Sequence, residues 1–151
     1  MDILKEKYII IEIIPTTRKK ETGNLVQISA LKLHGLQLLE RFDYRLNPTK
    51  VNIPDLINLT SYDQDFFTYL ESTEQLLEAF AKWSSGLPLL ILDNDYTKSY
   101  LKDLPNEKIS ICQFLNTEYQ DNIIEMLMKK YHLEPSHYIV DLLYESIIKE
   151  N

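Results

Sequence analysis

The stretch Tyr8-Ile9-Ile10-Ile11-Glu12-Ile13-Ile14 is apolar and mostly β-branched, and it contains a single carboxylate. β-Branched side chains favour strands, and a strand that is apolar on both faces is typical of the centre of a sheet. The stretch therefore predicts a central strand that is buried on both faces. Glu12 is its exceptional residue, because burying an unpaired carboxylate is costly.

Two more strands are predicted directly after this one. The polar segment 15–24 is typical of a loop, Leu25–Leu33 is typical of a second strand, and His34-Gly35 is typical of a tight turn. From Leu36 to Leu46 most apolar side chains recur at every second residue, which indicates a half-exposed strand. Because both connections are too short for crossover helices, we expect an antiparallel meander.

Helical and strand patterns alternate in the second half of the chain, after a long connection over residues 47–65. The expected elements are a helix from Thr73 that ends before Gly86, a strand at Leu87–Leu92, a short helix near Tyr96–Leu101, a strand at Ile109–Leu115, a helix at Asn116–Tyr131 and a last helix from near Pro135. A meander followed by βαβ units predicts one α/β domain over residues 1–151, with a mixed five-stranded sheet and helices on both faces.

Composition excludes several classes of protein. Cys112 is the only cysteine, which excludes an internal disulfide and a cysteine-based zinc site and fits the reducing cytoplasm. No apolar run could cross a bilayer, and the first residues carry mixed charges, so we expect neither a membrane span nor a secretory signal. The formal net charge of −7 argues against avid nonspecific binding of nucleic acid, since proteins that bind phosphates are usually basic.

The order of the elements, read with short motifs over nearly the whole chain, resembles the DEDD-type 3′–5′ exonucleases. In chain order, the motifs that carry the resemblance are Ile11-Glu12-Ile13-Ile14-Pro15-Thr16-Thr17, Gln27–Leu33, Leu46-Asn47-Pro48, Ile53-Pro54, Leu59-Thr60, Leu89–Leu92 followed by Asp93-Asn94, and His137. The ordered set is similar to the proofreading epsilon subunit of bacterial DNA polymerase III. The resemblance implies a ribonuclease H-like fold.

The family's reaction uses four carboxylates around two divalent cations, which orient the phosphate and activate the attacking water. Carried onto this sequence, the first carboxylate falls on Glu12, whereas the other three fall on Ile14, Thr97 and Leu142. Ions such as Mg²⁺ need several oxygen ligands in near-ideal geometry. The resemblance therefore implies a degenerate, inactive relative, a pseudoenzyme that needs no cofactor.

An active nuclease with a rearranged site is the alternative. It would hold Mg²⁺ or Mn²⁺ through Glu12, Asp93, Asp95 and Asp141, with His137 in the place of the family's general base. Asp141 lies one residue before the expected carboxylate, which is about 100° of rotation on a helix. Each residue also has a structural interpretation, since Asp93 and Asp95 are common turn formers and His137 could pair with Asp141 four residues later.

The expected partner depends on which hypothesis holds. An inactive domain would act as an accessory or interaction module, with a protein partner that could belong to the replication or repair machinery. A domain that binds nucleic acid without cleaving it is a third hypothesis, for which Arg18-Lys19-Lys20 offers possible phosphate contacts in the loop after the first strand. The acidic net charge counts against that third hypothesis.

Overall fold

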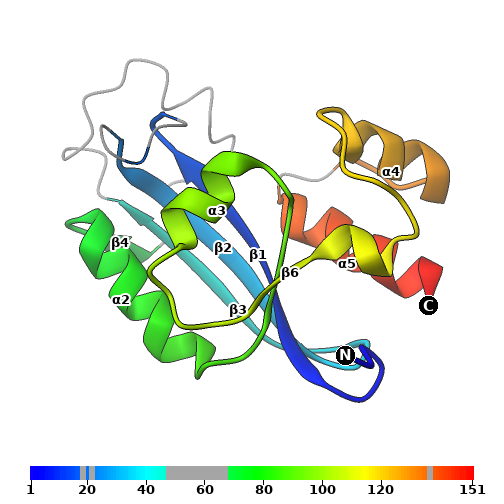
Figure 1. Ribbon diagram of the computed structural model, residues 1–151, viewed down its shortest axis with the longest axis horizontal. Helices are drawn as coiled ribbons and strands as arrows, with labels where there is room; N and C mark the ends of the chain where they lie inside the picture. Colours follow the sequence, from blue (N-terminus) through cyan, green and yellow to red (C-terminus); the bar gives the residue numbers. More distant parts are fainter. Residues whose placement is uncertain (18–19, 21–22, 47–67, 136–137) are drawn as a thin grey trace.

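The computed structural model describes residues 1–17, 20, 23–46, 68–135 and 138–151. These residues form a mixed sheet of six strands in the order β4-β3-β2-β1-β5-β6. Helices α2 and α3 lie on one side of the sheet, and α4 and α5 lie on the other (Figure 1). In the part of the chain that the structure describes, no helix has the length and apolar character of a membrane span.

The first half of the sheet is the predicted meander. Strands β1 (Lys7–Pro15), β2 (Leu25–His34) and β3 (Gln37–Leu46) pair antiparallel in sequence order. The turn between β2 and β3 requires Gly35, which has a φ of +60° and whose Cβ, if present, would lie 2.7 Å from the carbonyl oxygen of Leu4. The Tyr8 hydroxyl donates to the carbonyl oxygen of Gly35 at 2.6 Å, which attaches this turn to β1.

The second half contributes parallel strands and helices. Its elements are β4 (Thr68–Leu70), α2 (Thr73–Ser84), β5 (Leu89–Ile91), α3 (Asp95–Leu101), β6 (Lys108–Ser110), the 3₁₀ helix η3 (Ile111–Phe114), α4 (Ile123–Tyr131) and α5 (Ile139–Glu150). Strand β5 pairs parallel with both β1 and β6, as expected for βαβ units. The predicted α/β architecture is confirmed, and β4 adds a short sixth strand that pairs parallel with the end of β3.

Several element boundaries differ from the expectation. The strand expected at Ile109–Leu115 ends at Ser110, whose hydroxyl accepts from the Cys112 N–H and so begins η3. Helix α4 begins at Ile123 instead of Asn116, because Asn116 has a φ of +50° and lies outside any helix. The last helix begins at Ile139 instead of near Pro135.

A hydrophobic core lies on each face of the sheet. The odd residues of β1, such as Ile9 and Ile11, pack with α2 and α3, whereas Tyr8 and Ile10 pack with α4 and α5. Because side chains alternate along a strand, Glu12 points to the same face as Tyr8 and Ile10, toward α5. Both faces of β1 are therefore apolar because helices cover both sides of the sheet.

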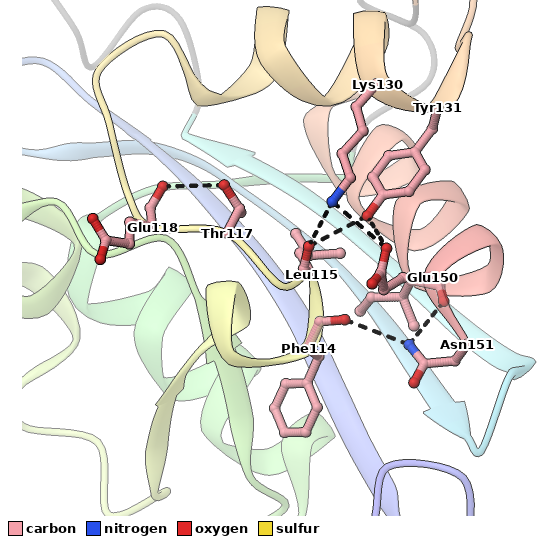
Figure 2. A network of polar contacts seen from close by, with 9 residues as sticks. Phe114, Leu115, Thr117, Glu118, Lys130, Tyr131, Glu150 and Asn151 are labelled. Carbon is pink, nitrogen blue, oxygen red and sulfur yellow. Dashed lines mark hydrogen bonds and ion pairs between the residues drawn. The ribbon is translucent and has the colours of Figure 1, made fainter.

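A polar network joins α4 to α5 and to the end of η3 (Figure 2). The Tyr131 hydroxyl donates to the Glu150 carboxylate and lies 3.3 Å from the carbonyl oxygen of Leu115. The Lys130 ammonium lies 3.7 Å from the same carboxylate. Because α4 is short, these contacts with Leu115 and Glu150 supplement its apolar packing.

Candidate functional site

A buried polar layer interrupts the apolar face of the sheet that α5 covers. Its sheet residues lie in register on three neighbouring strands, since Glu12 pairs with Ser29 and Ser29 pairs with Asp43. Glu12 is 6% exposed and Ser29 is fully buried, and the Asp43 side chain is 8% exposed. Buried polar groups are costly unless they are paired, so this row indicates either a functional site or a specific structural role.

The N-terminus of α5 lies above this row. The backbone N–H of Ile139, the first residue of α5, donates a hydrogen bond to Glu12. The first backbone N–H groups of a helix lack partners within the helix and carry partial positive charge, which favours a carboxylate. Because the N-cap residue Tyr138 makes no side-chain capping hydrogen bond, Glu12 caps α5 from the sheet.

Arg41 of β3 connects the layer to α5. Its guanidinium donates to the carboxylate of Asp141, in the first turn of α5, and its Nη1 lies 3.8 Å from Oδ2 of Asp43. The guanidinium also lies over the ring of Tyr138, with its carbon 5.0 Å from the ring centroid. Glu12, Asp43, Asp141 and Arg41 thus come from β1, β3 and α5. Arg45, 3% exposed, is a second arginine on the same face of β3.

Burial controls the protonation of this layer. Burial raises the pKa of Glu12 to about 8, the hydrogen bond from Ile139 opposes the shift, and the charges of Asp141 and Asp43 add to it. Burial also raises the pKa of Asp43, against the attraction of Arg41 and a hydrogen bond with Ser29. For Asp141, burial raises the pKa while Arg41 lowers it. At neutral pH Glu12 is therefore mostly protonated.

The structure brings together two of the predicted site residues, Glu12 and Asp141, which interact electrostatically. Asp93 and Asp95 lie elsewhere, in an open pocket of about 580 Å³ lined by Asp93, Asn94, Asp95, Tyr96, Tyr119 and Asp121. Asp93 accepts a hydrogen bond from the Ser110 hydroxyl. Neither Glu12 nor Asp141 lines that pocket, so the four proposed carboxylates occupy two separate places.

The remaining predicted residues are only partly described. Lys20 forms an ion pair with Asp103 at 2.8 Å. Arg18, Lys19 and His137 lie outside the described residues, as does the expected connection over 47–65. The pairing of His137 with Asp141, and the phosphate contacts of the basic loop, therefore stay predictions.

The motif alignment assigns the family's other three carboxylates to Ile14, Thr97 and Leu142, none of which has a carboxylate. Leu142 is 3% exposed in the core under α5, and Thr97 is 4% exposed in α3. By strand alternation Ile14 shares the face of Glu12 and thus the side of the sheet that α5 covers. The motif alignment also predicts that Ile14 and Leu142 lie close together; they lie on the same side of the sheet, and their proximity stays a prediction.

The donor groups do not fit the family's two divalent cations. Within the described ranges, no group of three or more His, Cys, Asp or Glu side chains is arranged to hold a metal ion. Glu12 Oε1 and Asp43 Oδ1 are buried and make no hydrogen bond to any described residue, and a protein cation, Arg41, already lies 3.8 Å from the other Asp43 oxygen. A carboxyl group with a pKa near 8 is also a weak ligand at neutral pH, because a ligand must be deprotonated.

Asp43 and Arg41 were not anticipated from the sequence. In β3 they alternate with Phe42 and Tyr44, whose rings stack 4.1 Å apart on the α2 side of the sheet. The alternation predicted a strand with one exposed face, so both charged residues were assigned to solvent. Counting back from the His34-Gly35 turn would not have found them, because the register shifts between Lys32 and Leu33, so that Ser29 pairs with Asp43 instead of Phe42.

Comparison with known sequences gives distant relatives. No family model matches the chain. The PolC-type DNA polymerase III of Staphylococcus epidermidis is 22% identical over 139 residues, which cover 84% of this chain and 10% of that protein. The PolC-type enzyme of Staphylococcus aureus is 21% identical over 145 residues, or 87% of this chain and 10% of the relative. The chain thus spans about a tenth of the length of the curated relatives it matches.

Comparison with solved structures shows an exonuclease-like fold. A product-bound exonuclease I superposes with a TM-score of 0.62 at 12% identity, over 97% of this chain and 43% of that one. The zinc-bound complex of Escherichia coli exonuclease I with single-stranded DNA gives a TM-score of 0.59 at 12% identity, covering 97% and 40% of the two chains. The chain has the ribonuclease H-like fold of the DEDD-type 3′–5′ exonucleases and weak sequence similarity to PolC-type DNA polymerase III.

Proposed function

We propose that this chain is one exonuclease-like domain that has lost catalysis and acts as a cytoplasmic accessory or interaction module in nucleic-acid metabolism. The observation that carries the proposal is the buried layer around Glu12. Its carboxylate caps α5, has a pKa raised to about 8 and lies beside carboxylates that contact an arginine. These contacts are those of a structural group, in the place where the family binds metal.

The charge balance supports the loss of activity. Two divalent ions about 3.5–4 Å apart repel each other and are held only by several shared carboxylates. In this chain Ile14, Thr97 and Leu142 supply none. Asp43 and Asp141 both interact with Arg41, whose positive charge opposes the entry of a further cation.

The proposed partner is a protein of the replication or repair machinery. Support comes from the similarity to PolC-type DNA polymerase III and from an exonuclease I structure described as a complex with SSB-Ct, which superposes with a TM-score of 0.59. Exonuclease I has also been solved with single-stranded DNA. The net charge of −7 favours a protein partner for this chain over nucleic acid.

The alternative is a metal-dependent 3′–5′ exonuclease with a rearranged site. The proximity of Asp141 to Glu12 favours it, because these two carboxylates come from the strand and the helix that carry the family's first and last motifs. Such an enzyme would require Mg²⁺ or Mn²⁺. It would also require deprotonated Glu12 and the displacement of Arg41 from Asp141.

An exonuclease assay decides between the two functions. The purified chain, its Glu12→Gln variant and an active exonuclease I are incubated with 5′-labelled single-stranded DNA in MgCl₂, MnCl₂ or EDTA. We expect the chain and its variant to give the same background in all three conditions. Degradation that needs the metal and disappears in Glu12→Gln would establish an active nuclease instead.

A further inference from the structure

Arg41 contacts two acidic side chains and one aromatic ring of the polar layer. Arg41 donates to Asp141, lies 3.8 Å from Asp43 and covers the ring of Tyr138. A guanidinium presents several N–H donors in one plane, so it can serve two carboxylates at once. The Arg41 side chain is 31% exposed and the Asp43 side chain is only 8% exposed. Arg41 thus lies at the edge of the layer, beside a carboxylate in its interior.

We propose that the Arg41 guanidinium is the resident cation for the carboxylates of Asp43 and Asp141, which lie beside Glu12, in the role that divalent metal has in catalytic relatives. This inference rests on the proposed function, because a cluster with a fixed protein cation is not a two-metal site. It explains why Asp43 and Asp141 can lie close together at the start of α5 without a metal. It also gives a reason why the donor groups do not fit divalent cations, namely the positive charge of Arg41 beside them.

The position of Arg41 in the sheet supports this assignment. Arg41 lies two residues before Asp43 on β3, so both side chains point to the face that α5 covers. Asp141 is in the first turn of α5 and meets Arg41 there. The same cation thus compensates a charge on the sheet and a charge on the helix, as a bridging ion would.

The Arg41 and Asp141 side chains are 31% and 29% exposed, but Arg41 also lies beside Asp43, which is 8% exposed. Removal of Arg41 therefore leaves a buried charge without compensation, which predicts energetic coupling within this group of side chains. We would measure urea unfolding at pH 7 for the wild type, Arg41→Gln, Asp141→Asn and the double variant. The pair Lys32 and Glu40 is the matched control, because it is also an ion pair on this sheet, at 3.1 Å, but its carboxylate is 56% exposed. We expect coupling of more than about tenfold in the unfolding equilibrium constant for Arg41 with Asp141, and of less than about fivefold for the control pair.

Metal binding gives the second measurement. The melting temperatures of the wild type, Arg41→Gln and Arg41→Lys are recorded in MnCl₂ and in NaCl of equal ionic strength. We expect Mn²⁺ to raise the melting temperature of Arg41→Gln alone, and to lose this effect when Asp141→Asn is added. Arg41→Lys retains the positive charge, so Mn²⁺ should not change its melting temperature. This variant still tests the inference if Arg41→Gln folds only in the presence of Mn²⁺.

Three results would overturn the inference. The first is coupling of Arg41 with Asp141 no larger than that of the control pair. The second is an Arg41→Gln protein that does not respond to Mn²⁺, and the third is a wild type that binds Mn²⁺ through Asp141. None of these concerns nuclease activity, so the exonuclease assay tests the proposed function separately.

Discussion

Replacing Glu12 with glutamine should make the domain more stable at neutral and alkaline pH. In the folded chain the pKa of Glu12 is raised from 4.5 to about 8, mainly by burial. Between these two values the unfolded chain has released the proton while the folded chain still holds it, so the stability of the wild type falls as pH rises. Glutamine carries no charge at any pH and keeps an oxygen that can accept from the Ile139 N–H.

The size of the effect follows from the shift. One pKa unit corresponds to about 1.4 kcal/mol. The difference between 4.5 and about 8 therefore corresponds to a loss of stability on the order of 5 kcal/mol from Glu12 alone. The contribution is fully present below pH 4.5, declines up to about pH 8 and is then constant. Such a loss is comparable with the total stability of many small domains.

The assay is urea unfolding followed by circular dichroism at several pH values from 5 to 9. We expect the difference in unfolding free energy between Glu12→Gln and the wild type to grow from pH 5 to about pH 8 and to stay constant above it. Glu107→Gln is the control, because Glu107 is exposed and precedes a strand of the same sheet. Parallel pH curves for the wild type and Glu12→Gln would refute the assignment of a buried, protonated Glu12.

Two other predictions concern the framework around the site. Gly35→Ala should destabilise the protein by about 2 kcal/mol or more, since the φ of Gly35 is +60° and the new Cβ would lie 2.7 Å from a backbone oxygen. Gly86→Ala is the control: the φ of Gly86 is +74° but no atom lies within 4 Å of the new Cβ, so this change should cost about 1 kcal/mol. Equal losses in thermal unfolding would contradict the packing at Gly35. Tyr131→Phe removes the hydroxyl that donates to Glu150 (Figure 2) and should cost about 1–3 kcal/mol in urea unfolding. An unchanged midpoint would show that this network does not hold α4 against α5.

The strongly patterned elements could be predicted from the sequence for clear physical reasons. The apolar run Tyr8–Ile14 has buried faces on both sides of the sheet, and the short connections around Gly35 allow only antiparallel pairing. Strand β4 has only three residues and pairs with β3 after a long connection, so its local sequence carries little signal. The late start of α4 depends on the left-handed backbone of Asn116, which apolar periodicity does not reveal.

The candidate site was only partly predictable. Glu12 was conspicuous because it is the one carboxylate in an apolar strand, and Asp141 was found through the last motif. Arg41 and Asp43 belong to a strand whose polar residues had an ordinary explanation as a solvent face. The contact of Arg41 with Asp141 depends on α5, which is about a hundred residues later in the chain. Only tertiary structure could bring these charges together.

The row formed by Glu12, Ser29 and Asp43 also determines how the strands are aligned along their length. Five of the nine residues of β1 are isoleucine, so sliding the strand by two residues along β2 would keep apolar side chains on both faces. Such a slip would place the Glu12 carboxylate opposite Leu31 or Gln27 in place of Ser29. It would also move Glu12 away from the Ile139 N–H and from the start of α5. One carboxylate thus gives an otherwise repetitive strand a single favourable alignment, which hydrophobic packing alone does not provide.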